Sequence, residues 1–335
     1  ASDVYKRQKF MCKNDDNNNN LPVQPEVEPS PVESGGQPDN GGKKDRSNLH
    51  QRLITAIFIA VLYIAPILLG FYVNELFYDA LIVFLMCAAS YEFSRAVSVK
   101  FAKPINSFVF INIVLGYIAF KLSFELLGMG GVTSFFGVMA VAFIACIVYN
   151  MVSNKYNINN VVSTLFVMIY PGAIMSYLIA LNYLGPFTHV AIIMAFGVTT
   201  LTDSMAYFVG STVKGPKLCP KISPKKTISG AIGGLVGGVI GGVIIYFFAK
   251  YGVVGCEPIL TATVPNVLNF LFLGLGTSLF CQIGDLISSY IKRACGIKDF
   301  GKILKGHGGF MDRIDGLIIS SVFIFIYFSI AGLLV

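Results

Sequence analysis

Charged residues are scarce in this sequence. Of its 335 residues, 13% are charged and 55% are hydrophobic, whereas an ordinary soluble domain carries about 25% charged residues. Eight of the 18 acids and eight of the 25 bases lie in the first 52 residues, so the remainder is poorer still in charge. Such a chain cannot cover a soluble globule with polar groups, and this indicates a protein whose solvent is lipid.

Patterns of histidine or cysteine that bind metals are also missing. The three histidines are far apart in the sequence, and the seven cysteines include no CxxC pair. These absences argue against a zinc site built from histidines. Most of the cysteines fall within apolar stretches, and we interpret them as small apolar residues.

The net charge of +7 does not indicate nucleic-acid binding. Outside the N-terminal segment the bases sit in a few short loops between apolar stretches, which fits membrane topology and anionic ligands better. We therefore expect no nucleic-acid partner.

The chain divides into three segments by composition. Residues 1–48 form a low-complexity tail rich in Asn, Pro and Gly, with too few apolar residues to offset the cost of ordering, and we expect it to be disordered. The tail does not begin with Met, so we expect its first residues to be a scar of sequence assembly or expression, with Met11 as the natural start. Residues 49–199 carry N-terminal transmembrane helices, and residues 200–335 carry the catalytic motifs.

Apolar stretches alternate with short polar loops from Leu53 onward. Each stretch is close to the roughly 20 residues that a helix needs to cross a bilayer, and helices satisfy their own backbone groups in lipid. The sequence therefore predicts an all-α integral membrane protein with about nine transmembrane helices. The expected spans are 53–70, 76–94, 105–127, 131–149, 161–184, 187–210, 229–250, 266–290 and 316–335.

The charges of the loops predict the orientation of these spans. With the N-terminus in the cytoplasm, fifteen bases fall in the loops between spans on the cytoplasmic side and two, Lys121 and Lys250, on the other. This asymmetry follows the positive-inside rule. We expect a cytoplasmic N-terminus and a C-terminus on the opposite side.

Two features within the spans have a structural interpretation. Gly230, Gly234 and Gly238 recur every four residues in the seventh span, a spacing that lets a neighbouring helix approach closely. Glu92 and Arg95 are three residues apart at the end of the second span, and we expect an ion pair within that helix.

Four acids lie within or beside the spans, where an ionisable group is costly and is a functional candidate. Asp203 and Asp285 lie near the cytoplasmic ends of the sixth and eighth spans, and Asp312 and Asp315 precede the ninth. Taken singly, each could be an ion-pair partner or a helix cap. Their similar depth on one side predicts a shared metal site, and sites of oxygen ligands suit Mg²⁺.

Basic and hydroxyl residues surround these acids in the sequence. Loops rich in lysine often serve only membrane topology, but the segment 223–227 also brings proline and hydroxyls to the start of a helix, which suits phosphate oxygens. The glycines beside His307 allow a close backbone approach to a ligand, and His307 could polarise a phosphate or stabilise the turn. The candidate substrate-binding residues in these two segments are Ser223, Lys225, Lys226, Thr227, His307, Gly308 and Gly309.

The segment 284–316 closely resembles the signature of the phosphatidate cytidylyltransferases, also called CDP-diacylglycerol synthases. It reads GDLISSYIKRACGIKDFGKILKGHGGFMDRIDG, and segments 203–207 and 223–227 resemble two further blocks of that family. Three positions depart from the family pattern. Ser229 and Ser288 stand where an acid or its amide is common, and Lys305 stands where proline often occurs.

The resemblance implies that the protein converts CTP and phosphatidate to CDP-diacylglycerol and pyrophosphate in phospholipid biosynthesis. It implies Mg²⁺ as cofactor, with a second cation left open, and Asp285, Asp312, Asp315 and Asp203 as its ligands. Catalytic roles fall on Asp285, Asp312, Asp315, Lys292, Arg293 and Arg313, and the resemblance adds Ser289 and Lys298 to the substrate-binding residues. It further implies contact with membrane lipids, allows a homodimer, and favours the bacterial cytoplasmic membrane with the active site facing the cytoplasm.

Two alternatives remain. A CTP-dependent kinase of polyprenol or phytol-type lipids would share CTP and the membrane but phosphorylate an alcohol; the full signature favours the cytidylyltransferase. A cation-coupled transporter would place acids near the middle of the bilayer and show paired repeats, whereas these acids cluster at one edge. The pattern of a CDP-alcohol phosphatidyltransferase does not occur in the sequence.

Overall fold

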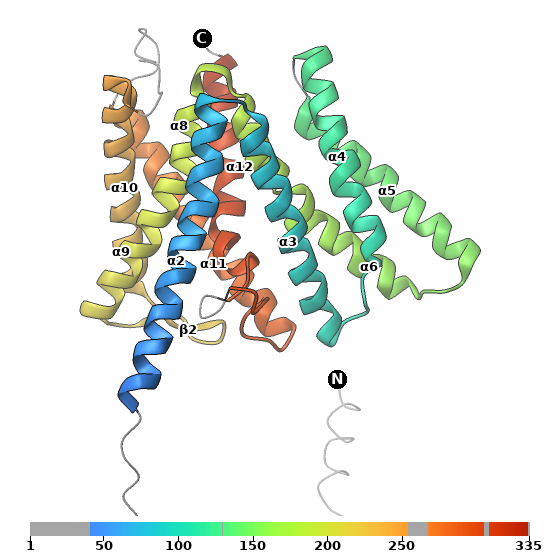
Figure 1. Cartoon of the computed structure of the whole chain (residues 1–335), viewed down its shortest axis with the longest axis horizontal. Coiled ribbons are helices and arrows are strands. Elements are labelled where there is room, and N and C mark those ends of the chain that lie inside the picture. The colour runs from blue at the N-terminus through green and yellow to red at the C-terminus, as the bar shows by residue number, and fades with distance from the viewer. Residues whose placement is uncertain (1–40, 129, 254–266, 305–307, 334–335) are drawn as a thin grey trace, which may run out of the picture. The chain divides into compact units, whose positions relative to one another are not determined.

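A computed structural model of the chain describes residues 41–128, 130–253, 267–304 and 308–333 (Figure 1). Residues 1–40 of the tail expected to be disordered, and His307, lie outside the described residues, whereas residues 41–48 are helical and belong to α2 (Gly41–Tyr72). The chain divides into two units, residues 1–44 and residues 45–335, and the second contains all the described residues except 41–44.

Helices make up nearly all of the described structure. Most membrane spans are single long helices, and two spans, Ile158–Tyr183 and Gly185–Thr212, are divided into shorter helices. In chain order the helices are α2 (Gly41–Tyr72), α3 (Leu76–Lys100), α4 (Asn106–Leu127), α5 (Gly131–Ser153), α6 (Ile158–Val167), η1 (Met168–Ala173), α7 (Ser176–Ala180), η2 (Leu181–Tyr183), η3 (Gly185–Phe187), α8 (Thr188–Ile193), η4 (Met194–Val198), α9 (Thr199–Thr212), α10 (Ile228–Tyr251), α11 (Val267–Ala294) and α12 (Met311–Leu333).

Within the described ranges, nine helical segments are long and apolar enough to cross a membrane. This confirms the predicted class, an all-α multi-pass membrane protein, and the predicted number of spans. The last helix begins at Met311 rather than at residue 316, so Asp312 and Asp315 lie in its first two turns. The predicted orientation of the spans stays a prediction.

The fifth span departs from a regular helix near its middle. Tyr170 has extended dihedral angles, φ −125° and ψ 115°, directly before Pro171. A proline disfavours helical angles at the residue before it and cannot donate a backbone hydrogen bond. The span Ile158–Tyr183 therefore consists of short helical pieces, α6 to η2, and it is the most deeply buried of the nine.

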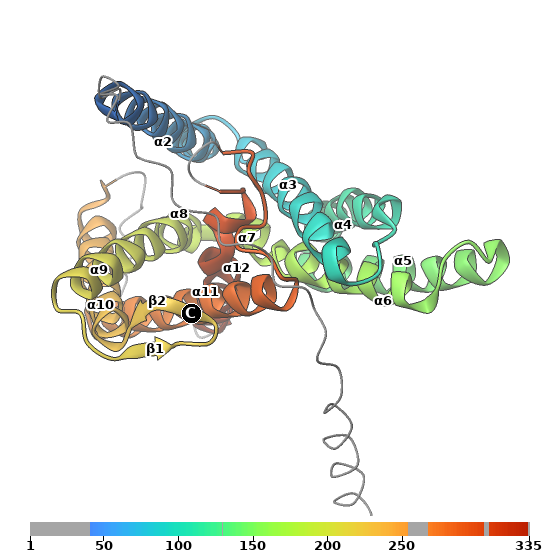
Figure 2. The same cartoon turned by 90° about the horizontal axis from the view of Figure 1, so that it is seen from below.

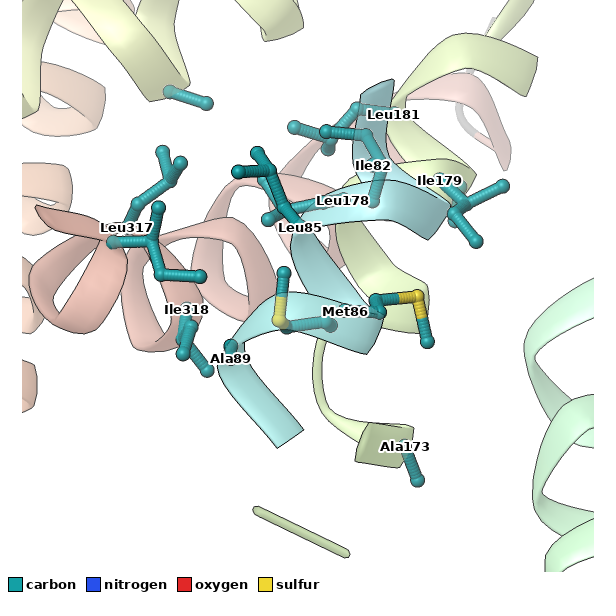
Figure 3. Close-up of a cluster of buried hydrophobic side chains, with 14 of the residues drawn as sticks. Ile82, Leu85, Met86, Ala89, Ala173, Leu178, Ile179, Leu181, Leu317 and Ile318 are labelled. Atoms are coloured by element: carbon teal, nitrogen blue, oxygen red, sulfur yellow. The ribbon is translucent and has the colours of Figure 1, made fainter. Parts of the chain in front are cut away.

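The core lies where α3, the fifth span and α12 meet (Figure 3). Ile82, Leu85, Met86 and Ala89 line one face of α3, because residues three and four apart on a helix are neighbours. In lipid, helices associate because their side chains pack closely, and not because apolar surface is removed from water. The side chains that they meet are Ala173, Leu178, Ile179, Leu181, Leu317 and Ile318.

The glycine face of α10 packs against α9 and α11, as predicted (Figure 1). A Cβ atom on Gly237 would lie 2.8 Å from the side chain of Met205 in α9, and one on Gly238 would lie 2.6 Å from the carbonyl oxygen of Gly274 in α11. Larger residues would force the three helices apart. The predicted close packing of this span is confirmed.

A short antiparallel hairpin joins α9 to α10, and the sequence did not predict it. Strand β1 (Lys217–Cys219) pairs with strand β2 (Ser223–Thr227), with Lys217 opposite Thr227. The hairpin lies beside α10 and α11 (Figure 2). Its lysine and proline content hides the strand pattern, because neither residue favours a strand.

Candidate active site

Two glycines bring α11 and α12 into close contact. A Cβ atom on Gly284 would lie 2.6 Å from the carbonyl oxygen of Asp315, and one on Gly316 would lie 2.6 Å from the sulfur of Cys281. The backbones can approach this closely only without side chains at these two positions. The acids that adjoin the glycines in sequence, Asp285 and Asp315, are thereby held at the crossing.

Three of the four predicted acids converge at this crossing. The carboxyl groups of Asp285 and Asp315 contact each other, and Asp203 of α9 is close enough to interact with both. Cys281 links the set, because its sulfur lies 3.9 Å from Oδ1 of Asp203 and also faces Gly316. Acids from three helices far apart in sequence thus face one another.

Two lysines lie against the acids. The Nζ atom of Lys226 in β2 lies 3.2 Å from Oδ2 of Asp285. The Nζ atom of Lys292 in α11 lies 2.9 Å from Oδ1 of Asp312 and 3.8 Å from Oδ2 of Asp315. These side chains are largely shielded from solvent, so the ammonium groups offset negative charge in a medium of low dielectric constant.

Asp312 differs from the other acids because one of its oxygens binds two backbone amides of the loop before α12. Its Oδ2 atom accepts hydrogen bonds from the backbone amides of Phe300 and Gly309, both at 3.0 Å. Its Oδ1 atom faces Lys292. Asp312 therefore holds the loop before α12 in place, next to Gly308, whose φ of 83° suits a glycine.

The hairpin residues have distinct surroundings. Thr227 is buried and caps α10, because its hydroxyl accepts the amide of Gly230 at 3.1 Å. Its hydroxyl also lies 3.1 Å from that of Ser229, which in turn donates to the carbonyl of Lys214. Lys225 is exposed, whereas Lys226 is half-buried against Asp285.

Arg293 joins two loops and does not contact the acids. Its guanidinium donates to the carbonyl oxygen of Ile222, at the turn of the hairpin, and to that of Ile297, at the start of the loop before α12. Lys298 is exposed and Ser289 is half-buried.

Two cavities meet at Asp203. The first, which we call the hairpin cavity, has a volume of about 320 Å³ and is lined by β2, α9, α10 and α11, including Lys225, Lys226 and Asp285. The second, the lateral cavity, has a volume of about 840 Å³ and is lined mainly by apolar side chains of α2, η4, α9, α10 and α12. It also reaches Arg313 and Asp315. Asp203 faces both cavities.

The donor set fits a hard divalent cation that binds through few protein oxygens. Mg²⁺ takes one or two carboxylates and completes its shell with water and phosphate oxygens, and Asp285 and Asp315 offer such a pair. Among the described residues, no three acids, histidines or cysteines are placed to enclose a metal ion by themselves. Asp312 binds two backbone amides and Lys292, and its predicted role as a ligand, like the whole metal site, stays a prediction.

Glu92 is a residue of this region whose partners the sequence did not reveal. The predicted ion pair with Arg95 is wrong, because Glu92 is 2% exposed and accepts the amide of Met311, at the start of α12. Arg95 instead lies over the ring of Tyr91. The presence of an acid within an apolar span indicated that Glu92 has a special role. The sequence could not reveal its partner, Met311, which is 219 positions away.

Two of the three residues that depart from the family pattern, Ser288 and Ser229, make hydrogen-bonding contacts in the structure. Ser288 is fully buried, and its hydroxyl lies 2.9 Å from that of Tyr170 in η1. This contact ties α11 to the broken fifth span. Ser229 contacts Lys214 and Thr227 as described above, and Lys305 lies outside the described residues.

Fold and site together define a multi-pass membrane protein with acids and bases gathered between two cavities at the ends of its helices. Residues 50–331 match the model of the Cytidylyltransferase family, and the chain belongs to this family.

Curated relatives support this assignment. The chain is 37% identical over 148 residues to the phosphatidate cytidylyltransferase of Brucella abortus biovar 1 (strain 9-941), a match that covers 43% of this chain and 49% of the relative. The chain thus spans about half the length of that relative. It is 28% identical over 286 residues to the enzyme of the same name from Bacillus subtilis (strain 168), covering 85% of this chain and 98% of the relative. It is also 51% identical over 73 residues, 21% of this chain and 23% of the relative, to the uncharacterized protein YnbB of Escherichia coli (strain K12).

Proposed function

We propose that this protein converts CTP and phosphatidate to CDP-diacylglycerol and pyrophosphate. The observation that carries the proposal is the meeting of two unlike cavities at Asp203, one beside lysines and one lined by apolar side chains. A nucleotide triphosphate suits the first, and acyl chains suit the second. The relatives named phosphatidate cytidylyltransferase support the same reaction.

Basic residues on the two sides of the acids would hold the two anions. Lys225 and Lys226 line the hairpin cavity, where they would neutralise the triphosphate. Arg313 lines the lateral cavity beside Asp315, where a guanidinium suits the phosphate of the lipid. Lys292 lies between the acids of α12 and can stabilise charge at either phosphate.

The reaction needs no nucleophile from the protein. A phosphate oxygen of phosphatidate attacks the α-phosphorus of CTP, and the bond to the bridging oxygen breaks, so that pyrophosphate leaves with its electron pair. Two anions repel each other as they approach, and negative charge builds on the leaving group. The lysines and Arg313 offset both, and the cavities align the reactants.

Asp285 and Asp315 would hold Mg²⁺, with Asp203 facing the same space. The ion would supply charge neutralisation for the phosphates of CTP and for the leaving pyrophosphate. A second cation stays open. The protein's own acids contribute by facing one another at a crossing that two glycines hold fixed.

The orientation and the location follow from the same proposal. The basic loops would face the cytoplasm, where CTP is available, and the acyl chains would stay in the bilayer. The membrane would be the cytoplasmic membrane of a bacterium, because the relatives described above are bacterial. A homodimer is compatible with this arrangement.

The test uses the purified full chain in detergent with phosphatidate, Mg²⁺ and CTP labelled at the α-phosphate. We expect label in the lipid fraction, loss of transfer with EDTA, and loss of transfer in Asp285→Asn. The matched control is Asp79→Asn, which changes a buried acid elsewhere, bound by Tyr117, Asn182 and Tyr183. In a parallel assay with CTP labelled at the γ-phosphate, transfer of that label to lipid without transfer of the α-label would contradict the proposal and point to the lipid kinase, which the family match does not favour.

A further inference from the structure

Glu92 lies beneath the loop that leads into α12. It belongs to α3, a helix that carries none of the acids and bases described for the active site, and it is 2% exposed. Its Oε2 atom accepts the amide of Met311 at 2.9 Å, and its carboxylate also bonds the backbone of Phe310. The first amides of a helix lack partners within the helix, so this carboxylate satisfies groups at the start of α12.

Two glycines of the loop leave room for this carboxylate. A Cβ atom on Gly301 or on Gly309 would overlap the carboxylate of Glu92. The loop can therefore close over Glu92 only with glycine at both positions. The fit between one acid and two glycines ties α3 to the loop at three points, with Met311 as the third.

A second carboxylate holds the same loop from its other side. Asp312 accepts the amides of Phe300 and Gly309, while Glu92 holds Phe310 and Met311. Lys292 then joins Asp312 to Asp315. A continuous set of contacts thus runs from Glu92, through the loop, to the acids at the crossing of α11 and α12.

The negative charge of Glu92 is costly to bury. Among the described residues its Oε1 atom has no hydrogen-bond partner, although it is buried. A buried carboxylate with an unpaired oxygen is costly. A charged acceptor binds backbone amides more strongly than the neutral side chain of glutamine does, so we interpret the acid as serving to hold the loop tightly rather than to add to overall stability.

We propose that Glu92 is a positioning residue of the active site. It fixes Phe310 and Met311 at the start of α12, and with them the backbone at Gly301 and Gly309, so that Asp312, Lys292 and Asp315 keep their mutual geometry. It acts through these residues and does not touch substrate. The effect on turnover rests on the proposed function, whereas the effect on the loop does not.

The first experiment compares Glu92→Gln with the unchanged protein, both as the full chain in detergent. We expect kcat/KM to fall about 10- to 100-fold, as is typical for residues that orient the groups of a site, with a melting temperature close to that of the unchanged protein. Hydrogen exchange should quicken at Phe300 and Gly309, which Asp312 binds, as well as at Phe310 and Met311. Unchanged kcat/KM together with unchanged exchange at Phe300 and Gly309 would overturn the proposal.

The matched control is Asp79→Asn. Asp79 is a second buried acid of the same helix, bound by Tyr117, Asn182 and Tyr183 and thirteen residues from Glu92, or about 20 Å along the helix axis. We expect this variant to lower the melting temperature and to leave kcat/KM and the exchange of the loop unchanged. An equal loss of kcat/KM in both variants would mean that any buried acid of α3 matters equally, which contradicts a positioning role for Glu92.

A second variant covers the case in which Glu92→Gln fails to fold. Gly301→Ala keeps Glu92 but places a methyl group where its carboxylate lies. It should reproduce the loss of kcat/KM and the faster exchange at Phe300. Gly137→Ala is the control, because a Cβ atom there meets nothing within 4 Å. If the unchanged protein transfers no label from CTP, the proposed function fails, while the exchange data still decide whether Glu92 holds the loop.

Discussion

The Nζ atom of Lys292 lies 2.9 Å from Oδ1 of Asp312 and binds it from the facing helix. The same ammonium group lies 3.8 Å from Asp315, one helical turn further along α12. The three side chains are between 8% and 15% exposed, so their charges are screened little by water. One lysine of α11 therefore stabilises two acids that would otherwise repel each other.

Replacing Lys292 by methionine should destabilise the protein and abolish transfer. Breaking a buried ion pair by removing one partner costs about 3 kcal/mol, because it leaves an unpaired buried charge. We expect a lower melting temperature and no label in lipid. Lys155→Met is the control, because Lys155 is exposed and is not among the candidate site residues. An unchanged melting temperature in Lys292→Met would contradict the burial of this pair.

Asp285→Asn and Asp312→Asn should fail in different ways. Mg²⁺ with CTP should raise the melting temperature of the unchanged protein, since a ligand of the native state stabilises it. Asp285→Asn should lose this rise yet melt normally without ligand. Asp312→Asn should melt at a lower temperature without ligand, because a side-chain amide cannot accept two backbone amides and a lysine as a carboxylate does. If the two variants melted identically with and without ligand, the assignment of ligand binding to Asp285 and of loop stability to Asp312 would be wrong.

Gly284→Ala should force α11 and α12 apart. The added methyl group would lie 2.6 Å from the carbonyl oxygen of Asp315, and overpacking of this kind costs about 1–3 kcal/mol. We expect a lower melting temperature and a loss of transfer, because the acids beside the crossing separate. Gly137→Ala should change neither quantity. Full activity in Gly284→Ala would show that the crossing does not position the acids.

Gly197→Leu tests the lateral cavity. Gly197 lines this cavity, and a Cβ atom there has a single neighbour within 4 Å, so a larger side chain fits without distorting the helix. The side chain would occupy space that we assign to acyl chains. We expect KM for phosphatidate to rise several-fold and KM for CTP to stay unchanged in steady-state assays. A rise confined to KM for CTP would reverse the assignment of the two cavities.

The spans and the grouping of the acids could be predicted from the sequence. Hydropathy and helix length suffice for nine spans, because lipid leaves a chain few alternatives to helices of about 20 residues. Asp203, Asp285 and Asp315 could be placed together because each lies near the end of a span on the same predicted side.

The partners of the individual side chains could not be predicted. Glu92 had a base at helical spacing, and only the tertiary fold shows that the loop before α12 takes its carboxylate. Asp312 was grouped with the metal ligands, whereas backbone amides of Phe300 and Gly309 occupy one of its oxygens. Such contacts join segments whose approach depends on packing, and no local pattern encodes them.

Helix α2 bounds the lateral cavity, and none of its described side chains, from residue 54 to residue 72, is buried. The same cavity is bounded by α10, whose glycines lie in close contact with α9 and α11. A lipid that keeps both its acyl chains in the bilayer would reach the acids by displacing α2, whose side chains are not buried against the rest of the protein. Under the proposed function, exchange of substrate and product would be diffusion in the plane of the membrane, at a rate set by how often α2 moves away from the cavity.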